Sequence, residues 1–132
     1  TKIIHVQGGI LIKELNQQLA SPEYNLALPT QGAQPTVSLA GALSMCTKGT
    51  GLDFQCLSSY VSEFSIILPN GESKTMTRQE NEALFYEMLC GMGCFGLITA
   101  VKVQCVDLEQ LQETTESCSF SRMITDLSQI IH

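Results

Sequence analysis

Ser38-Leu-Ala-Gly-Ala-Leu-Ser-Met-Cys-Thr-Lys-Gly-Thr-Gly51 is a stretch rich in glycine, small residues and hydroxyl side chains. A second stretch of this kind, Gly91-Met-Gly-Cys-Phe-Gly-Leu-Ile-Thr99, follows it farther along the chain. Glycine has no Cβ, so a glycine-rich backbone lets a large flat or phosphorylated ligand approach closely. Amides and hydroxyl groups in such loops can donate hydrogen bonds to that ligand. The two stretches therefore predict binding loops; the alternative for Ser38–Gly51 is a plain connecting loop.

The segment between the two stretches contains a predicted hairpin. Phe64–Leu68 is rich in bulky apolar residues and predicts a strand, and Glu72–Met76 predicts the returning strand. Pro69-Asn-Gly71 lies between them, and Asn-Gly favours a type I′ turn, whose two central residues need a positive φ. A hairpin joins antiparallel strands, which argues against a doubly wound parallel sheet. We therefore expect an α+β fold with a largely antiparallel sheet flanked by helices.

Helical patterns lie on both sides of this hairpin. Apolar residues spaced at i, i+4 and i+8 predict an amphipathic helix over residues 10–19. Thr77 followed by Glu80 has the pattern of a capping box, which predicts a helix from Thr77 to about Leu89. The remaining apolar patterns predict strands over 2–6 and 97–106 and a helix over 125–131.

The composition excludes several classes of protein. The 132 residues are 44% hydrophobic and 15% charged, which is typical of one folded domain. A net charge of −6 offers no basic surface for nucleic acid or for an anionic membrane. No apolar run has the length of a transmembrane helix. The first residues resemble a strand already under way and the last an unfinished helix, so we expect a fragment of a longer protein.

The cysteines are more numerous than a core requires. Six are present, at positions 46, 56, 90, 94, 105 and 118. Their density is below that of a disulfide scaffold, so we expect mostly buried free thiols. Cys90 and Cys94 are separated by three residues, but no second pair or nearby histidine accompanies them, so no metal site is predicted.

Five motifs in order give the chain a specific resemblance. It resembles the second half of the FAD-binding domain of PCMH-type (vanillyl-alcohol-oxidase-type) flavoproteins, and among these the L-gulono-1,4-lactone and D-arabinono-1,4-lactone oxidases. The matching segments are a strand–glycine–helix unit at 6–19, a leucine-to-glycine step at 28–32, Ser38–Gly41 with Cys46–Gly49, a strand and turn at 57–71, and 82–85 with Gly93–Thr99. No motif is decisive alone, but their order and intervals are fairly specific.

This resemblance implies an organisation of the chain. Residues 1–106 would be the second subdomain of the FAD-binding domain, and residues 107–132 the start of the substrate domain of a lactone oxidase. The N-terminal half of the FAD-binding domain, which the fragment lacks, would be its partner. The implied cofactor is FAD, held between the two subdomains.

The resemblance also implies which residues line the cofactor. They are Ser38, Gly41, Leu43, Cys46, Thr47, Lys48, Gly49 and Ile98, the last through backbone groups at the adenine end. Two positions depart from the family pattern: Cys46 stands where a glycine is usual, and Lys48 where a histidine is usual. Most catalytic residues would lie outside the fragment, so none is assigned here.

The implied activity is oxidation of a sugar 1,4-lactone, as in ascorbate-like biosynthesis. A hydride would pass from a lactone C–H to the flavin, and molecular oxygen or another acceptor would reoxidise it. The resemblance also implies association of the full-length protein with an internal membrane. Two alternatives stay open: a non-catalytic remnant or interaction module that has lost FAD binding, and a dehydrogenase of the same fold that acts on a hydroxy acid.

Overall fold

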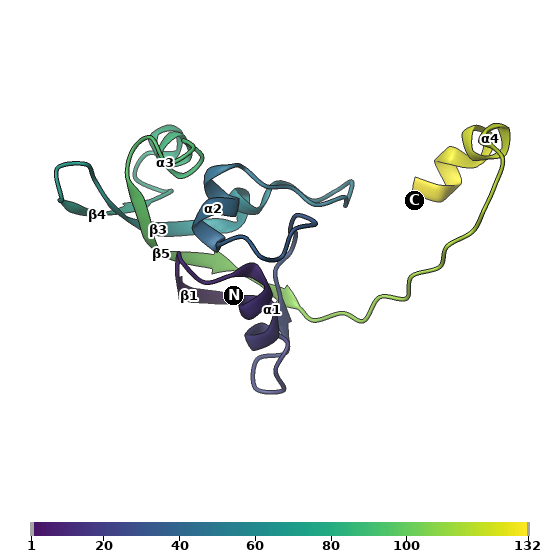
Figure 1. Cartoon of the computed structure of the whole chain (residues 1–132), viewed down its shortest axis with the longest axis horizontal. Coiled ribbons are helices and arrows are strands. Elements are labelled where there is room, and N and C mark those ends of the chain that lie inside the picture. Colours follow the sequence, from purple (N-terminus) through teal and green to yellow (C-terminus); the bar gives the residue numbers. More distant parts are fainter. Residues whose placement is uncertain (1, 132) are drawn as a thin grey trace.

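The computed structural model describes residues 2–131, with side chains to residue 127 (Figure 1). Strands and helices alternate irregularly along the chain. Their bounds are β1 (Ile3–Gln7), α1 (Ile12–Leu19), β2 (Leu26–Ala27), α2 (Leu39–Ser44), the 3₁₀ turn η1 (Leu57–Tyr60), β3 (Val61–Ile67), β4 (Ser73–Thr77), α3 (Glu82–Leu89), β5 (Leu97–Gln104), β6 (Val106–Asp107) and α4 (Phe120–Ile131).

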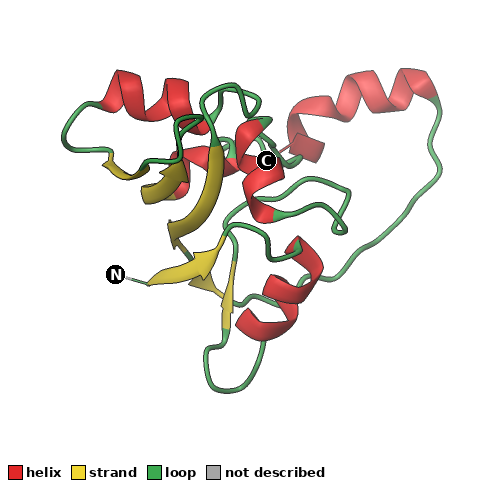
Figure 2. Ribbon diagram, turned by 60° about the vertical axis from the view of Figure 1, so that its left-hand side comes forward, coloured by secondary structure: helices red, strands yellow, loops and turns green. Residues whose placement is uncertain are grey.

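Four strands form an antiparallel sheet in the order β1-β5-β3-β4 (Figure 2). The first strand of the chain therefore pairs with β5, nearly a hundred residues later, and Val6 lies opposite Val101. The short strands β2 and β6 form a second antiparallel pair. The predicted α+β fold with an antiparallel sheet is confirmed.

One face of this sheet carries the core. Phe64 of β3 lies opposite Val101 of β5, and both are fully buried. The Phe64 ring meets the ring of Phe85 from α3 edge-on, with centroids 5.0 Å apart. On the opposite face, Lys102 and Glu63 form an ion pair with 2.8 Å between Nζ and Oε2. The alternation of apolar and polar residues along β3 and β5 thus orients the sheet.

The amphipathic helix predicted over 10–19 forms from Ile12 to Leu19 as α1. Its Ile12, Leu15 and Leu19 side chains are buried. The last helix, α4, begins at Phe120, earlier than the predicted residue 125. Figure 1 shows α4 set apart from the sheet, at the end of a segment without helix or strand.

The hairpin forms between the predicted strands, but its turn is not type I′. The Gly71 amide donates to the Leu68 carbonyl at 2.9 Å, and the Leu68 amide to the Glu72 carbonyl at 2.8 Å. These bonds enclose a three-residue loop in which only Gly71 has a positive φ, of 84°. A three-residue loop needs the left-handed conformation only at its last residue, so Asn70 keeps an ordinary φ. The Asn70 side chain instead accepts a hydrogen bond from the Glu72 amide.

The predicted capping box at Thr77 is also wrong. Thr77 is the last residue of β4 and pairs with Glu63. The N-cap of α3 is Asn81, whose side-chain oxygen accepts a hydrogen bond from the Leu84 amide at 3.1 Å. Threonine and asparagine can both cap a helix. Because Thr77 is paired with Glu63 in the sheet, the helix begins later and Asn81 is its N-cap.

All six cysteines are free thiols, but only Cys105 is buried. Cys46, Cys94 and Cys118 are exposed, so the expectation of mostly buried thiols is wrong. The exposed ones lie in loops, where apolar neighbours do not surround them. Among residues 2–131, no group of three or more His, Cys, Asp or Glu side chains is arranged to hold a metal ion. No helix within the same residues is long and apolar enough to cross a membrane.

Three glycine-to-alanine variants test the backbone geometry. A Cβ at Gly96 would lie 2.2 Å from the Ile67 carbonyl oxygen, and its φ is +147°. Gly71 has φ +84° and open space around it, and Gly9 has open space and no positive φ. We expect Gly9→Ala to be near neutral, Gly71→Ala to cost about 1 kcal/mol, and Gly96→Ala to cost more than about 2 kcal/mol. Chemical denaturation measures all three; equal costs at Gly71 and Gly96 would contradict the close packing of β5 on β3.

Candidate functional site

The first glycine-rich stretch begins as a helix rather than as a loop. Ser38 is the N-cap of α2, and its side-chain oxygen accepts a hydrogen bond from the Gly41 amide at 3.2 Å. The next turn buries Leu39 and Leu43 completely. The carbonyl of Leu43 accepts a hydrogen bond from the buried Ser58 hydroxyl at 3.0 Å. The helix therefore holds the stretch firmly against the core.

Gly8 connects α2 to the sheet. Its amide donates to the Thr99 carbonyl and its carbonyl accepts from the Ala40 amide, both at 2.8 Å. A Cβ at Gly8 would lie 2.6 Å from the Ile98 carbonyl oxygen. Glycine is required here because β5 and α2 approach from both sides.

The second glycine-rich stretch lies against the far end of α2. The Met92 amide donates to the Ser44 carbonyl at 3.2 Å. Gly91 contacts Phe95 so closely that a Cβ would lie 2.6 Å from its ring. The two stretches that are separate in sequence are therefore adjacent in the structure.

A third segment, residues 28–32, packs against the loop that follows α2. The buried Thr30 hydroxyl accepts a hydrogen bond from the Gly49 amide at 3.0 Å. A Cβ at Gly49 would lie 2.7 Å from the Gln31 carbonyl oxygen, and one at Gly32 would lie 2.7 Å from Thr47 Cγ2. The Lys48 ammonium bonds the Gly51 carbonyl at 2.8 Å and the Gly49 carbonyl at 3.4 Å. These contacts fix the backbone of residues 47–51.

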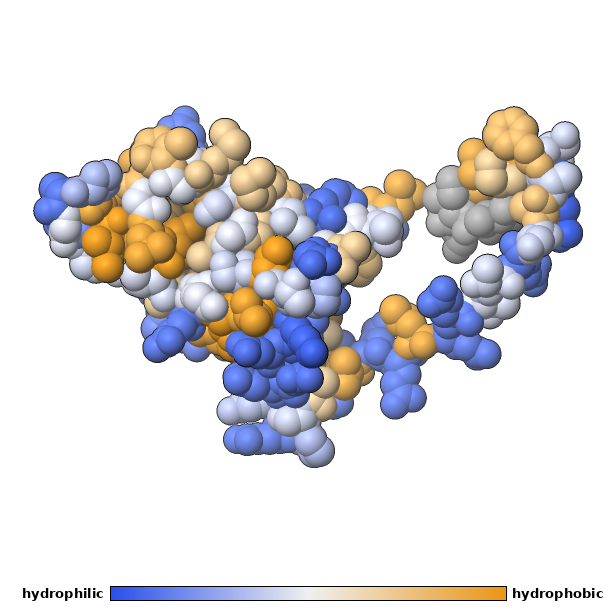
Figure 3. Space-filling view, viewed as in Figure 1, coloured by the Kyte–Doolittle hydropathy of each residue, from blue (hydrophilic) through white to orange (hydrophobic). Residues whose placement is uncertain are grey.

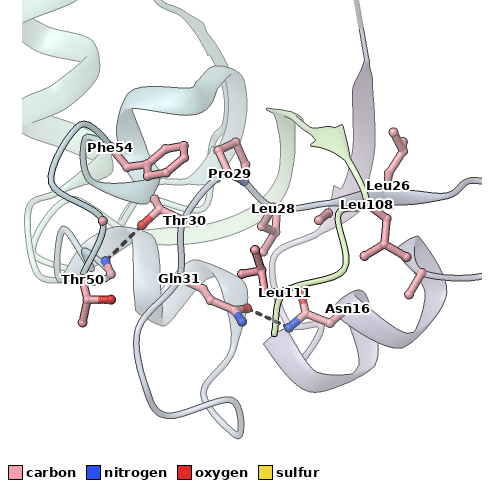
Figure 4. A pocket seen from close by; sticks show the side chains of 14 residues that line it. Asn16, Leu26, Leu28, Pro29, Thr30, Gln31, Thr50, Phe54, Leu108 and Leu111 are labelled. Atoms are coloured by element: carbon pink, nitrogen blue, oxygen red, sulfur yellow. Dashed lines mark hydrogen bonds between the residues drawn. The ribbon is translucent and has the colours of Figure 1, made fainter. Parts of the chain in front are cut away.

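Two hollows flank this loop. The one beside α2 has a volume of about 420 Å³. It is lined by Val37, Ser38, Gly41, Ala42, Met45 and Thr47. The other, of about 550 Å³, lies between α1, residues 28–31 and residues 49–54 (Figure 4). Leu108 and Leu111 of the segment after β6 line the same hollow. Across it, the Asn16 side chain donates to the Gln31 side chain at 2.7 Å.

The predicted cofactor residues are distributed over four places. Ser38, Gly41 and Thr47 gather in the smaller hollow, and Gly49 lies in the larger one. The Leu43 and Ile98 side chains are in the core, so only their backbone groups can face a ligand. Cys46 lies on the surface in a left-handed conformation with φ +49°, and does not line either hollow.

Sequence reasoning missed Thr30, Gln31 and Phe54 as site residues. The segment from Leu28 to Gly32 matches a family motif, but nothing in that motif indicates which side chain contacts the loop at Gly49. A threonine between a proline and a glutamine gives no periodic signal of burial. Its contact joins residues nineteen positions apart and depends on the fold.

Cys46 interacts with two other cysteines, Cys56 and Cys90, beside the same loop. The pKa of Cys46 is raised to about 12. The largest cause is a hydrogen bond with the Cys56 side chain, followed by desolvation and by the charges of Cys56 and Cys90. Burial opposes ionisation of Cys56, but hydrogen bonds with Ser59 and Cys46 lower its pKa overall. Elsewhere, burial raises the pKa of Cys105 to about 11.

Known proteins match most of the chain. A family model described as an FAD binding domain matches residues 1–77. L-gulonolactone oxidase of Bos taurus is 30% identical over 126 residues, which are 96% of this chain and 28% of that protein. A putative D-arabinono-1,4-lactone oxidase of Neurospora crassa is 33% identical over 106 residues, 80% of this chain and 19% of that protein. Mitochondrial L-galactono-1,4-lactone dehydrogenase 2 of Oryza sativa is 29% identical over 114 residues, 86% of this chain and 19% of that protein.

The fold has a solved counterpart. The structure of 6-hydroxy-D-nicotine oxidase from Arthrobacter nicotinovorans superposes with a TM-score of 0.70 at 20% identity, covering 80% of this chain and 23% of that one. The chain thus spans less than a third of each of these proteins. Together, the matches confirm the resemblance that the five motifs indicate.

The Thr30 hydroxyl provides a test of the loop. Thr30→Val keeps the side-chain volume but leaves the Gly49 amide without its acceptor, so we expect a loss of about 1 to 3 kcal/mol of unfolding free energy. Thr30→Ser retains the hydroxyl and is the matched control. Denaturant titration of both variants measures the difference. A Thr30→Val variant as stable as Thr30→Ser would show that this hydrogen bond does not hold the loop.

Proposed function

The chain belongs to the FAD-binding domain family, and from that premise we propose that it is part of an enzyme that oxidises sugar 1,4-lactones. FAD is the cofactor of this family. The support for the lactone is the run of relatives named as gulonolactone, arabinonolactone or galactonolactone oxidases and dehydrogenases. The acceptor that reoxidises the flavin would be molecular oxygen or another oxidant.

We propose that residues 1–106 form the second subdomain of the FAD-binding domain. The sheet and its helices end with β6, after which residues 108–119 have neither helix nor strand. Figure 3 shows that this segment is mostly hydrophilic and that apolar side chains gather on α4 beyond it. Residues 107–132 would therefore begin the substrate domain, and α4 would pack within that domain through Phe120, Ile124 and Leu127, which are exposed in this chain.

The smaller hollow supports the assignment of the cofactor. Ser38, Gly41, Ala42 and Thr47 are small, so the hollow has room for an extended ligand. Of these, the Ser38 side-chain oxygen already accepts a hydrogen bond from the Gly41 amide, while Thr47 adds a hydroxyl group to the lining. We propose that Ser38, Gly41 and Thr47 contact FAD, and that Gly49 extends the contact into the larger hollow.

The two departures from the family pattern do not oppose this assignment. The Cys46 side chain lies beside Cys56 and is absent from the lining of the smaller hollow. Lys48 folds back onto the carbonyls of Gly49 and Gly51 and thereby stabilises the loop. In this proposal FAD supplies the hydride-accepting chemistry, and the residues of this chain bind and orient it.

The observation that carries the proposal is the family match together with lactone-named relatives, and the full-length protein tests it. We expect the purified full-length protein to show flavin absorbance, which is bleached when a sugar 1,4-lactone is added without oxygen. Anaerobic spectrophotometry with L-gulono-, L-galactono- and D-arabinono-1,4-lactone measures this. A protein without flavin would favour the remnant; one whose flavin is reduced by a 2-hydroxy acid and by no lactone would favour the hydroxy-acid dehydrogenase.

A glycine variant tests the binding loop. Gly49→Ala would place a Cβ 2.7 Å from the Gln31 carbonyl and 2.8 Å from Thr30 Oγ1, so the loop must move. We expect the full-length Gly49→Ala protein to lose at least half of its bound flavin, measured as the ratio of flavin to protein absorbance. Gly9→Ala, with open space around the new Cβ, is the control. Unchanged flavin content in Gly49→Ala would remove Gly49 from the site.

A further inference from the structure

The thiols of Cys46 and Cys56 are brought together by a backbone contact across the loop. The Leu57 amide donates to the Thr47 carbonyl at 2.8 Å, which aligns the residues that follow each cysteine. On the other side, the Met92 amide bonds the Ser44 carbonyl, which brings Cys90 to the same place. Residues 44–47 are therefore in contact with residue 57 on one side and with residue 92 on the other.

Access and geometry distinguish the members of this group. Cys46 is exposed, and Cys56 is partly exposed. Cys46 has φ +49°, a left-handed conformation that a non-glycine residue seldom adopts. Among the described side chains, no group of three or more His, Cys, Asp or Glu is arranged to hold a metal ion. Two adjacent accessible thiols can be oxidised together to a disulfide.

We propose that Cys46 and Cys56 are a redox-active pair that forms a disulfide when the protein meets hydrogen peroxide. Cys56 is the attacking residue and Cys46 the resolving one. This assignment concerns only the chain's own thiols and does not depend on the proposed lactone oxidation.

The environment of Cys56 favours its role as the nucleophile. Its sulfur lies 3.4 Å from the Ser59 hydroxyl oxygen, and hydrogen bonds from the Ser58 and Ser59 backbone also stabilise the thiolate. These bonds outweigh burial and lower the pKa of Cys56. The Cys46 thiol, whose pKa is raised, stays protonated beside it. Thiolate character is what selects one cysteine for reaction with a peroxide.

The reaction balances in two steps. The Cys56 thiolate attacks one oxygen of hydrogen peroxide; an S–O bond forms, the O–O bond breaks, and the released hydroxide takes a proton to become water. Cys56 is then a neutral sulfenic acid, so the charge that opposed ionisation of Cys46 is gone. The Cys46 sulfur attacks the Cys56 sulfur; the S–S bond forms, the S–O bond breaks, and the leaving hydroxide departs as water with the Cys46 proton. Two thiols lose two electrons, and peroxide gains them.

The disulfide would close a ring over residues 46–56, which contains the loop held by Thr30 and Lys48. The hydrogen bond from the Leu57 amide to the Thr47 carbonyl already holds the two ends of this ring beside each other. Cys90 is the competing partner, and Cys118, in the segment after β6, is an exposed thiol outside the group.

Non-reducing peptide mapping of the full-length protein tests the proposal without any variant. After treatment with a small excess of hydrogen peroxide, we expect a cross-linked peptide that contains Cys46 and Cys56, and the protein to be lighter by two hydrogen atoms. Thioredoxin or dithiothreitol should restore the original mass. Peroxide-treated protein in which Cys46 and Cys56 are both still alkylated by maleimide, or in which Cys46 is joined to Cys90, would overturn it.

Serine variants then separate the two roles. In Cys46→Ser, oxidation should stop at a sulfenic acid on Cys56 that dimedone traps, with at least a tenfold gain in labelling over the unmodified protein. In Cys56→Ser, Cys46 should stay reduced under the same treatment. Cys118→Ser is the matched control and should form the disulfide normally. Dimedone labelling of Cys46 in Cys56→Ser, with no labelling of Cys56 in Cys46→Ser, would contradict the assignment of the nucleophile.

Discussion

The contact of Gly8 with two elements is the constraint on which the rest of the structure depends. Its amide bonds β5 and its carbonyl bonds α2, so one residue without a side chain sets the distance between the sheet and that helix. The direction of α2 then fixes where the following loop leaves the core. The Ser58 hydroxyl also holds α2 in place, because it donates a hydrogen bond to the Leu43 carbonyl. The two hollows lie on either side of a loop whose starting point is determined in this way.

Backbone hydrogen bonds, rather than side-chain charges, shape the candidate site. The loop after α2 is held by Thr30 through the Gly49 amide and by Leu57 through the Thr47 carbonyl. The only cation in this loop, Lys48, bonds carbonyl groups of the loop itself. A site built from fixed amides, hydroxyls and small residues suits a large ligand that is recognised along its length. Gly8 and Gly49 are two positions at which an added Cβ would meet the backbone of another segment.

The apolar patterns were sufficient to predict the strands of the larger sheet, in which Phe64, Ile66, Val101 and Val103 are buried, and the hairpin was sufficient to predict that its strands are antiparallel. The glycine motifs were sufficient to indicate the family. The turn at Asn70 and the cap at Thr77 could not be predicted reliably, since both depend on where β4 stops pairing with β3. The contacts of Thr30 and the approach of Cys46 to Cys56 join distant segments, and no local pattern in the sequence encodes them. Leu43 and Ile98 were assigned to the cofactor site by motif, whereas their side chains belong to the core.

Pairing of β1 with β5 has a consequence for how the protein is made. Ile3 lies opposite Gln104, and Gln7 opposite Ala100, so the neighbour of β1 is the last of the four strands of this sheet to be translated. During synthesis, β1 and α1 leave the ribosome long before the strand that completes their sheet. This pairing raises the contact order, and topologies of high contact order fold slowly. Strand edges stay unpaired until the partner strand is available. Until β5 is synthesised, the edge of β1 that it covers has no partner within this sheet.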